Sequence, residues 1–201
     1  MKNNLITFLC CAALLAACES PKKEKEKENT TVEKVDVMKT TTDKMLADVD
    51  HAWDSIIRQD DNKFASIKRL LDEISYCKKY DMSTQDALVK EIPVVIAKRF
   101  NPDNIEITNK AVEDYDNATD AYVLKVFALA DKTKELESHP IAAELKSDIT
   151  TANSPGTVSS VRNYYTQVVK VYNKYLEENK EAISKMGPPY NSLSPKKTFE
   201  Q

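Results

Sequence analysis

The sequence predicts an all-α fold, an elongated antiparallel bundle of about three to five helices that follows a disordered N-terminal stalk. Glycine occurs only twice in 201 residues, which leaves few positions for tight β-hairpin turns. Lys, Glu, Ala and Leu are abundant, and all four favour helices. Apolar residues recur in steps of three and four over long stretches, as in amphipathic helices. Such helices must bury their apolar stripes against one another, which favours crossing angles of about 20°.

Residues 1–17 have the pattern of a secretory signal peptide: a basic start followed by an apolar run, Leu5 to Leu15, that is too short to span a bilayer. The next residues, Ala16-Ala17-Cys18, complete a motif that resembles a bacterial lipobox. We therefore expect cleavage between Ala17 and Cys18 and lipid attachment to Cys18, which would anchor the chain in a membrane. The alternative is an ordinary signal peptide in which the cysteine occurs by chance.

After the lipid site, residues 19–34 have alternating charge and contain a single apolar residue, so the segment 18–34 cannot bury enough surface to offset the entropy of ordering. We expect a flexible charged stalk. The net charge of the whole chain is −3, which gives no indication of nucleic-acid binding. Of the four cysteines, only Cys77 lies beyond the signal peptide and the lipid site, so disulfides do not hold the fold together.

A first long helix, or two helices in line, is predicted from Val35 to Lys79. Its apolar seam is Thr42, Leu46, Val49, Trp53, Ile56, Ile67, Leu70, Ile74 and Cys77. Six polar residues, 58–63, interrupt this seam and place Asp60 and Lys63 where apolar side chains are expected. A hinge, a buried polar layer and a solvated break between two helices are all compatible with this pattern.

A capping box at residues 83–86 predicts the start of a second helix, which Pro93 should kink or end. Residues 101–103 separate it from a third helix that stops near residues 138–140, before a shorter fourth helix. The third seam is Val112, Tyr115, Thr119, Tyr122, Val126, Leu129, Thr133 and Leu136. The fourth is Ile141, Leu145 and Ile149.

Ser154 and Pro155 are typical of a helix start, because Ser caps the free amides and Pro fits the first helical position. We expect one helix of about 32 residues to end at Gly187. Its seam is Val158, Val161, Tyr165, Val168, Tyr172, Tyr175, Ile183 and Met186. The predicted bundle domain is thus 35–187, and residues 188–201 are expected to form a flexible tail.

The sequence of residues 162–173, Arg-Asn-Tyr-Tyr-Thr-Gln-Val-Val-Lys-Val-Tyr-Asn, resembles the LemA family signature Arg-x-x-Tyr-Asn-x-x-Val-x-x-Tyr-Asn, with Thr166 as the one departure. Residues 137–140 are similar to that family's Glu-x-Tyr-Pro turn, and residues 52–56 to its Ala-Trp-x-x-Val segment. The resemblance implies a membrane-tethered, mostly helical envelope protein built as an antiparallel bundle. It implies no catalytic residues.

No residue pattern singles out a catalytic site, a cofactor site or a phosphate-binding loop. His51 with Asp48 and Asp54 has helical spacing for a metal site, but a solvated charged face explains these residues better. His139 is expected to cap a helix. Cys77 on the seam is expected to behave as a small apolar residue. The sequence therefore favours no metal, no cofactor and no enzyme activity.

The candidate polar layer or interface consists of Asp60, Lys63, Arg162, Tyr165 and Tyr172. The hypothesis that best fits all these observations is a lipid-anchored bacterial envelope protein, a non-catalytic adaptor or scaffold with a protein partner in the envelope. The alternatives are a surface-displayed peptide- or glycan-binding lipoprotein and, as a minor one, an envelope enzyme. Glu19, rather than Asp, after the cysteine favours the outer membrane in a two-membrane bacterium. The long apolar seams are also compatible with a homo-oligomer, in which helices of two chains pair.

Overall fold

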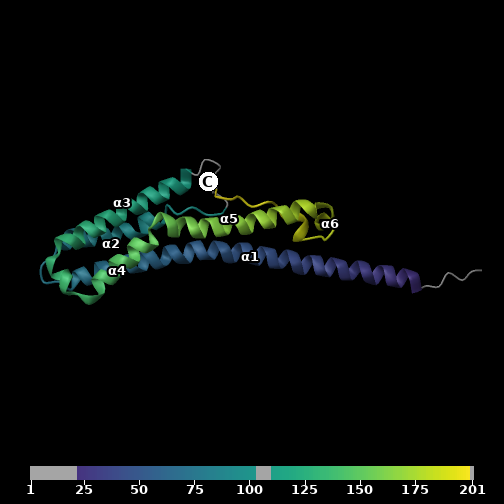
Figure 1. The fold of residues 1–201 in the computed structure, drawn as a ribbon. Helices are drawn as coiled ribbons and strands as arrows, with labels where there is room; N and C mark the ends of the chain where they lie inside the picture. Colours follow the sequence, from purple (N-terminus) through teal and green to yellow (C-terminus); the bar gives the residue numbers. More distant parts are fainter. Residues whose placement is uncertain (1–21, 103–109, 200–201) are drawn as a thin grey trace, which may run out of the picture. The chain divides into compact units, whose positions relative to one another are not determined.

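The computed structural model describes residues 22–102 and 110–199, and this part of the chain contains helices and no strand (Figure 1). The all-helical fold class is therefore confirmed. The chain divides into two compact units, residues 1–38 and 39–201. Of the first unit, the structure describes residues 22–38, which are helical. The predicted signal peptide and lipid site at Cys18 lie outside the described residues.

Helix α1 (Lys22–Ser75) begins within the segment that the sequence predicts as a charged stalk. Lys and Glu are strong helix formers, which accounts for a helical backbone there even though the segment has almost no apolar residues. The helix also continues without interruption through residues 58–63. Of the three possibilities that the sequence leaves open for this segment, the structure shows the polar layer.

Helix α2 (Met82–Ile96) is capped by Asp81, whose carboxylate accepts hydrogen bonds from the backbone N–H and the hydroxyl of Thr84. The cap thus lies two residues before the predicted one at Ser83, because the Asp carboxylate reaches the free amides from there. The paired hydrogen bonds lower the pKa of Asp81. Pro93 lies inside α2, and the helix ends at Ile96.

Helix α3 (Lys110–Lys132) is shorter than predicted, since Thr133 interrupts it and a 3₁₀ helix, η1 (Lys134–Ser138), follows. Helix α4 spans Pro140–Ala152. Ser154 then caps α5 (Pro155–Glu178) by accepting a hydrogen bond from the Thr157 N–H, as the sequence predicts.

The last predicted helix is too long, because α5 ends at Glu178 and a separate short helix, α6 (Lys180–Ser184), follows. The residue between them is Asn179, whose side-chain amide donates to the carbonyl of Tyr175 at 2.9 Å. The same carbonyl also accepts the backbone N–H of Asn179 at 3.1 Å, and Asn179 departs from helical dihedral angles with φ of −114° and ψ of 14°. Gly187 then adopts a left-handed backbone with φ of 75°, and a second 3₁₀ helix, η2, covers Tyr190–Ser192.

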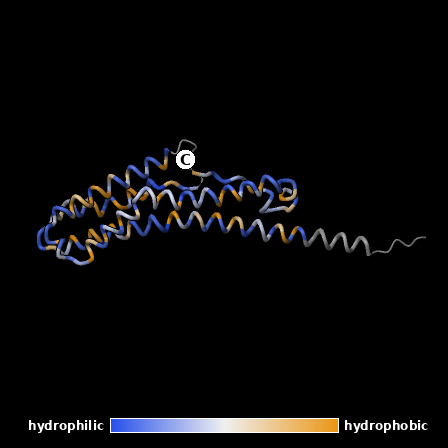
Figure 2. The backbone as a smooth tube through the Cα atoms, viewed as in Figure 1, coloured by the Kyte–Doolittle hydropathy of each residue, from blue (hydrophilic) through white to orange (hydrophobic). Residues whose placement is uncertain are grey.

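Within the 39–201 unit, neighbouring helices run antiparallel. Side-chain contacts pair the end of α1 with the start of α2, as in the bond from Gln85 to the Leu71 carbonyl, and α3 returns along α2. Helices α4 and α5 follow one another along α1 in the opposite direction (Figure 1). Hydrophobic positions recur on the sides that face neighbouring helices (Figure 2). The largest fully buried side chains include Tyr122, Tyr165, Tyr172, Ile67, Leu70, Leu71, Ile74, Leu145 and Ile149.

The segment after η2 differs from the flexible tail that the sequence predicts for residues 188–201. Its described part, residues 193–199, lies against α5. Phe199 is buried among aromatic rings and accounts for the difference, because a single large side chain at the end of a polar segment leaves no periodic signal.

Candidate functional site

A buried polar layer lies at the middle of α1. Asp60 and Lys63 are only 9% and 6% exposed, and their charged groups are 2.8 Å apart. The spacing of three residues places both side chains on the inner face of the helix. The two residues are thus brought together as an ion pair in the core.

Two residues from other parts of the chain complete this layer. Arg99, which follows α2, places Nη2 2.5 Å from Oδ2 of Asp60 and 2.8 Å from the exposed Asp61. The hydroxyl of Tyr115 on α3 donates to the same Asp60 oxygen. Neither Arg99 nor Tyr115 was assigned to the layer from sequence, because Arg99 lies in a connection and Tyr115 fits the apolar seam.

The layer also shifts proton affinities. Burial, and then the negative charge of Asp60, raise the pKa of Tyr115, so the phenol stays a neutral donor. For Arg99, burial lowers the pKa, but the hydrogen bond with Tyr115 and the charge of Asp60 outweigh it and raise the pKa. The arrangement therefore places one carboxylate between the side chains of Lys63, Arg99 and Tyr115.

An aromatic cluster adjoins this layer and joins four separate parts of the chain. Trp53 on α1 contacts Phe100, Tyr165 and Phe199, with ring centroids 6.0, 5.3 and 6.3 Å away. Phe100 also packs edge-on against Tyr115 of the polar layer, at 5.7 Å. Edge-to-face rings at these distances add to the energy of burial.

Arg162 on α5 lies beside the aromatic cluster and near the polar layer. Its guanidinium makes two parallel bonds to Asp116 on α3, at 2.7 and 2.6 Å. Its Cζ atom also lies 5.2 Å from the Phe100 ring centroid and 5.5 Å from that of Phe199. Arg162 and Tyr165 therefore belong to the same cluster, as the sequence proposes for an interface or polar layer.

Tyr172 lies two turns further along α5 and takes no part in the polar layer. Its side chain is buried, which raises its pKa, and its hydroxyl donates to the Ser194 carbonyl at 3.5 Å. The neighbouring Asn173 bonds to Lys196. Of the five predicted residues, four lie in or beside the polar layer, and Tyr172 instead holds the 193–199 segment.

Cys77, His139 and Glu73 form a second constellation, which the sequence analysis does not find. The His139 Nδ1 lies 3.0 Å from the Glu73 carboxylate, and Nε2 lies 3.8 Å from the Cys77 sulfur. His139 occupies the N-cap position of α4, but its side chain makes no capping bond, so its predicted capping role is wrong. Burial, and then Glu135 and Glu73, raise the pKa of Cys77. A raised pKa favours the unreactive thiol over the thiolate.

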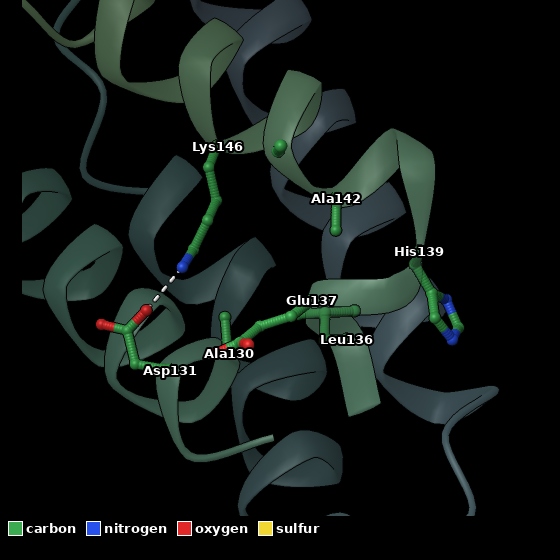
Figure 3. Close-up of a pocket in the computed structure, with 8 residues that line it drawn as sticks. Ala130, Asp131, Leu136, Glu137, His139, Ala142 and Lys146 are labelled. Carbon is green, nitrogen blue, oxygen red and sulfur yellow. Dashed lines mark hydrogen bonds and ion pairs between the residues drawn. The ribbon is translucent and has the colours of Figure 1, made fainter. Parts of the chain in front are cut away.

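An open cleft of about 500 Å³ lies beside this constellation, between the end of α3, η1 and α4 (Figure 3). Lys146 and Asp131 point toward one another and form an ion pair at 2.5 Å, whereas the His139 ring points away from them (Figure 3). The remaining labelled side chains are Ala130, Leu136, Glu137 and Ala142. The cleft combines the Lys146–Asp131 ion pair, Glu137 and His139 with the apolar side chains of Ala130, Leu136, Ala142 and Ala143.

Among the residues that the structure describes, no group of three or more His, Cys, Asp or Glu side chains is placed to hold a metal ion. His51, Asp48 and Asp54 are all exposed on α1. They therefore lie on a solvated face, which is the explanation that the sequence favours.

No family model, no curated protein and no solved structure matches this chain. In the described residues, no helix is long and apolar enough to cross a membrane.

Proposed function

We propose that this chain is a lipid-anchored, non-catalytic adaptor of the bacterial envelope, tethered through Cys18 and presenting its helical bundle to a protein partner. The lipobox-like Leu15–Cys18 supports the anchor. The resemblance to the LemA family supports the same role, since it implies a membrane-tethered helical envelope protein.

The observation that carries the adaptor role is an apolar surface between α1 and α5. It surrounds a shallow hollow of about 270 Å³. Tyr164 and Val171 are 55% and 59% exposed there, although both are large and apolar. The hollow is lined by Met45, Asp48, Tyr164, Val168, Val171 and Tyr172. An exposed apolar patch with a polar edge is typical of a protein-binding surface.

The anchor is tested by the intact mass of the protein from isolated membranes, compared with Cys18→Ala. We expect the native mass to match residues 18–201 plus diacylglyceryl and acyl groups, and the variant to lack them. An unmodified native chain would contradict the anchor.

The adaptor role is tested by crosslinking in intact membranes, followed by detergent extraction. We expect defined crosslinked species for the native chain and their loss for Val171→Lys, which places a charge in the apolar surface. The matched control is Lys170→Ala, an exposed neighbour on α5. Recovery of the native chain only as a lone species would contradict the adaptor role.

A further inference from the structure

The 193–199 segment lies on α5 in the manner of a bound peptide. Asn173 bonds to the backbone of Lys196 twice: its amide donates to the carbonyl, and its side-chain oxygen accepts from the N–H, both at 2.8 Å. The Ser194 carbonyl accepts from Tyr172, and the Phe199 carbonyl accepts from Thr166, each at 3.5 Å. All four contacts go to backbone atoms of the segment, so they are independent of its side chains.

The one side chain that is deeply held is Phe199, which is 6% exposed. Its ring stacks on Trp53 with an angle of 6° between planes and meets Phe100 and Tyr165 edge-on. The Arg162 guanidinium lies over the same ring. Residues 194–197 are exposed, and Phe199 is the one buried residue of the 193–199 segment.

This combination is a general way to bind an extended peptide, in which main-chain hydrogen bonds give affinity and a side-chain pocket gives specificity. Trp, Tyr and Arg are also the residues that dominate binding energy at protein interfaces. The receptor residues come from α1, α5 and the connection after α2, and the ligand comes from a segment that follows α6.

We propose that these residues form a peptide-binding site for an extended segment of a partner protein with an aromatic residue three positions after the one held by Asn173. The 193–199 segment occupies this site in cis and competes with the partner. The proposal goes beyond the proposed adaptor function, since it adds a second binding site to the apolar surface around Val171 and names the chemistry of the segment that this site receives. A tethered segment acts at an effective concentration of about millimolar, so it would set a threshold for partner binding.

The test uses the full chain in detergent and a fluorescein-labelled synthetic peptide with the sequence of residues 193–199. Anisotropy measures binding, and the fluorescence of Trp53, the only tryptophan of the chain, reports on the ring that stacks on it. The Phe199→Ala variant lacks the ring that occupies the site in cis. We therefore expect it to bind the labelled peptide at least about tenfold more tightly than the native chain does. The same peptide with Ala in place of Phe should lose at least about tenfold in affinity.

A second variant covers the case in which Phe199→Ala does not fold. Lys196→Pro removes the N–H that donates to Asn173 and leaves the aromatic cluster intact, so it should also strengthen binding of the labelled peptide. Adding Asn173→Ala to either variant should abolish that gain, whereas Lys174→Ala, an exposed neighbour, should not.

The proposal is overturned if a folded variant binds the Phe and Ala peptides equally, or binds the Phe peptide no better than the native chain does. This assay needs neither lipid nor a membrane. Its failure would therefore remove the peptide site and leave the anchor and the adaptor surface to their own experiments. An unmodified native chain in the mass experiment would remove the anchor alone.

Discussion

The carboxylate of Asp60 in the middle of α1 lies 2.5 Å from the guanidinium of Arg99, 39 positions along the chain. Lys63 and Tyr115 bind the same carboxylate, so three parts of the chain meet at one buried anion. Burying charges costs several kcal/mol per ion unless partners compensate, and here each charge has an opposite one. A polar layer of this kind fixes the register of the surrounding helices, because any slip leaves a charge buried without its partner.

Asp60→Ala should lower the free energy of unfolding by about 3–5 kcal/mol, because Lys63 would remain buried without its anion and the half-buried Arg99 would keep only Asp61. Urea unfolding, monitored by circular dichroism, measures this free energy. The matched control is Asp61→Ala, which removes an exposed carboxylate from the same Arg99 and should cost less than about 1 kcal/mol. Equal costs for the two variants would show that burial of the pair does not matter.

Arg162→Lys should destabilise the protein by about 1–2 kcal/mol although the charge is kept. Lys cannot reproduce the paired bonds to Asp116 or place a planar guanidinium over Phe100 and Phe199. Chemical unfolding measures the loss, and Lys174→Ala, which removes an exposed pair with Glu178, is the control. A loss no greater than that of the control would contradict the role assigned to Arg162.

The protein should lose stability in alkali. Burial, and then a nearby carboxylate, raise the pKa of Tyr115 and Tyr122 in the folded state. An unfolded tyrosine releases its proton near pH 10, whereas these two keep theirs, so the free energy of unfolding should fall as the pH rises above about 10. Urea midpoints on either side of that pH test this. Tyr122→Phe should make the fall of the unfolding free energy with pH less steep. Tyr164→Phe, at an exposed position, is the control and should change this slope less than Tyr122→Phe does.

The Cys77 thiol should react slowly in the folded protein. It is 3% exposed, and burial followed by Glu135 and Glu73 raises its pKa, so little thiolate forms and little of it is accessible. Iodoacetamide labelling, read by mass spectrometry of the peptide that contains Cys77, should be far slower in buffer than in urea. Equal rates would instead identify Cys77 as an activated nucleophile beside His139.

Sequence periodicity predicts the helices and much of their buried faces. Ile67, Leu70 and Ile74 are fully buried on α1, and Leu145 and Ile149 on α4, as expected. On α5 the pattern is less accurate: Val161 and Val168 are half-buried, whereas Val169, Thr166 and Leu176 are buried. The buried stripe there is wide because α5 is covered by α1 on one side and by the 193–199 segment on another.

Helix ends depend on single side chains, and the sequence predicts them unevenly. The Ser154 cap is confirmed because Ser followed by Pro has few other roles. The breaks at Thr133 and Asn179 are not predicted, because the apolar seam continues past both. At Asn179 the backbone leaves helical geometry for a single residue, with φ of −114° and ψ of 14°, which the spacing of apolar residues does not reveal.

The sequence by itself determines the all-helical fold, the apolar stripes, the isolated Cys77 and the unusual polar positions at Asp60 and Lys63, because composition and spacing are local properties of the chain. Only the tertiary structure decides that α1 stays unbroken, that Arg99 and Tyr115 bind Asp60, and that Phe199 lies against Trp53. These contacts join residues from connections and helices far apart in the chain. Their partners follow from packing in three dimensions, which no periodic pattern encodes.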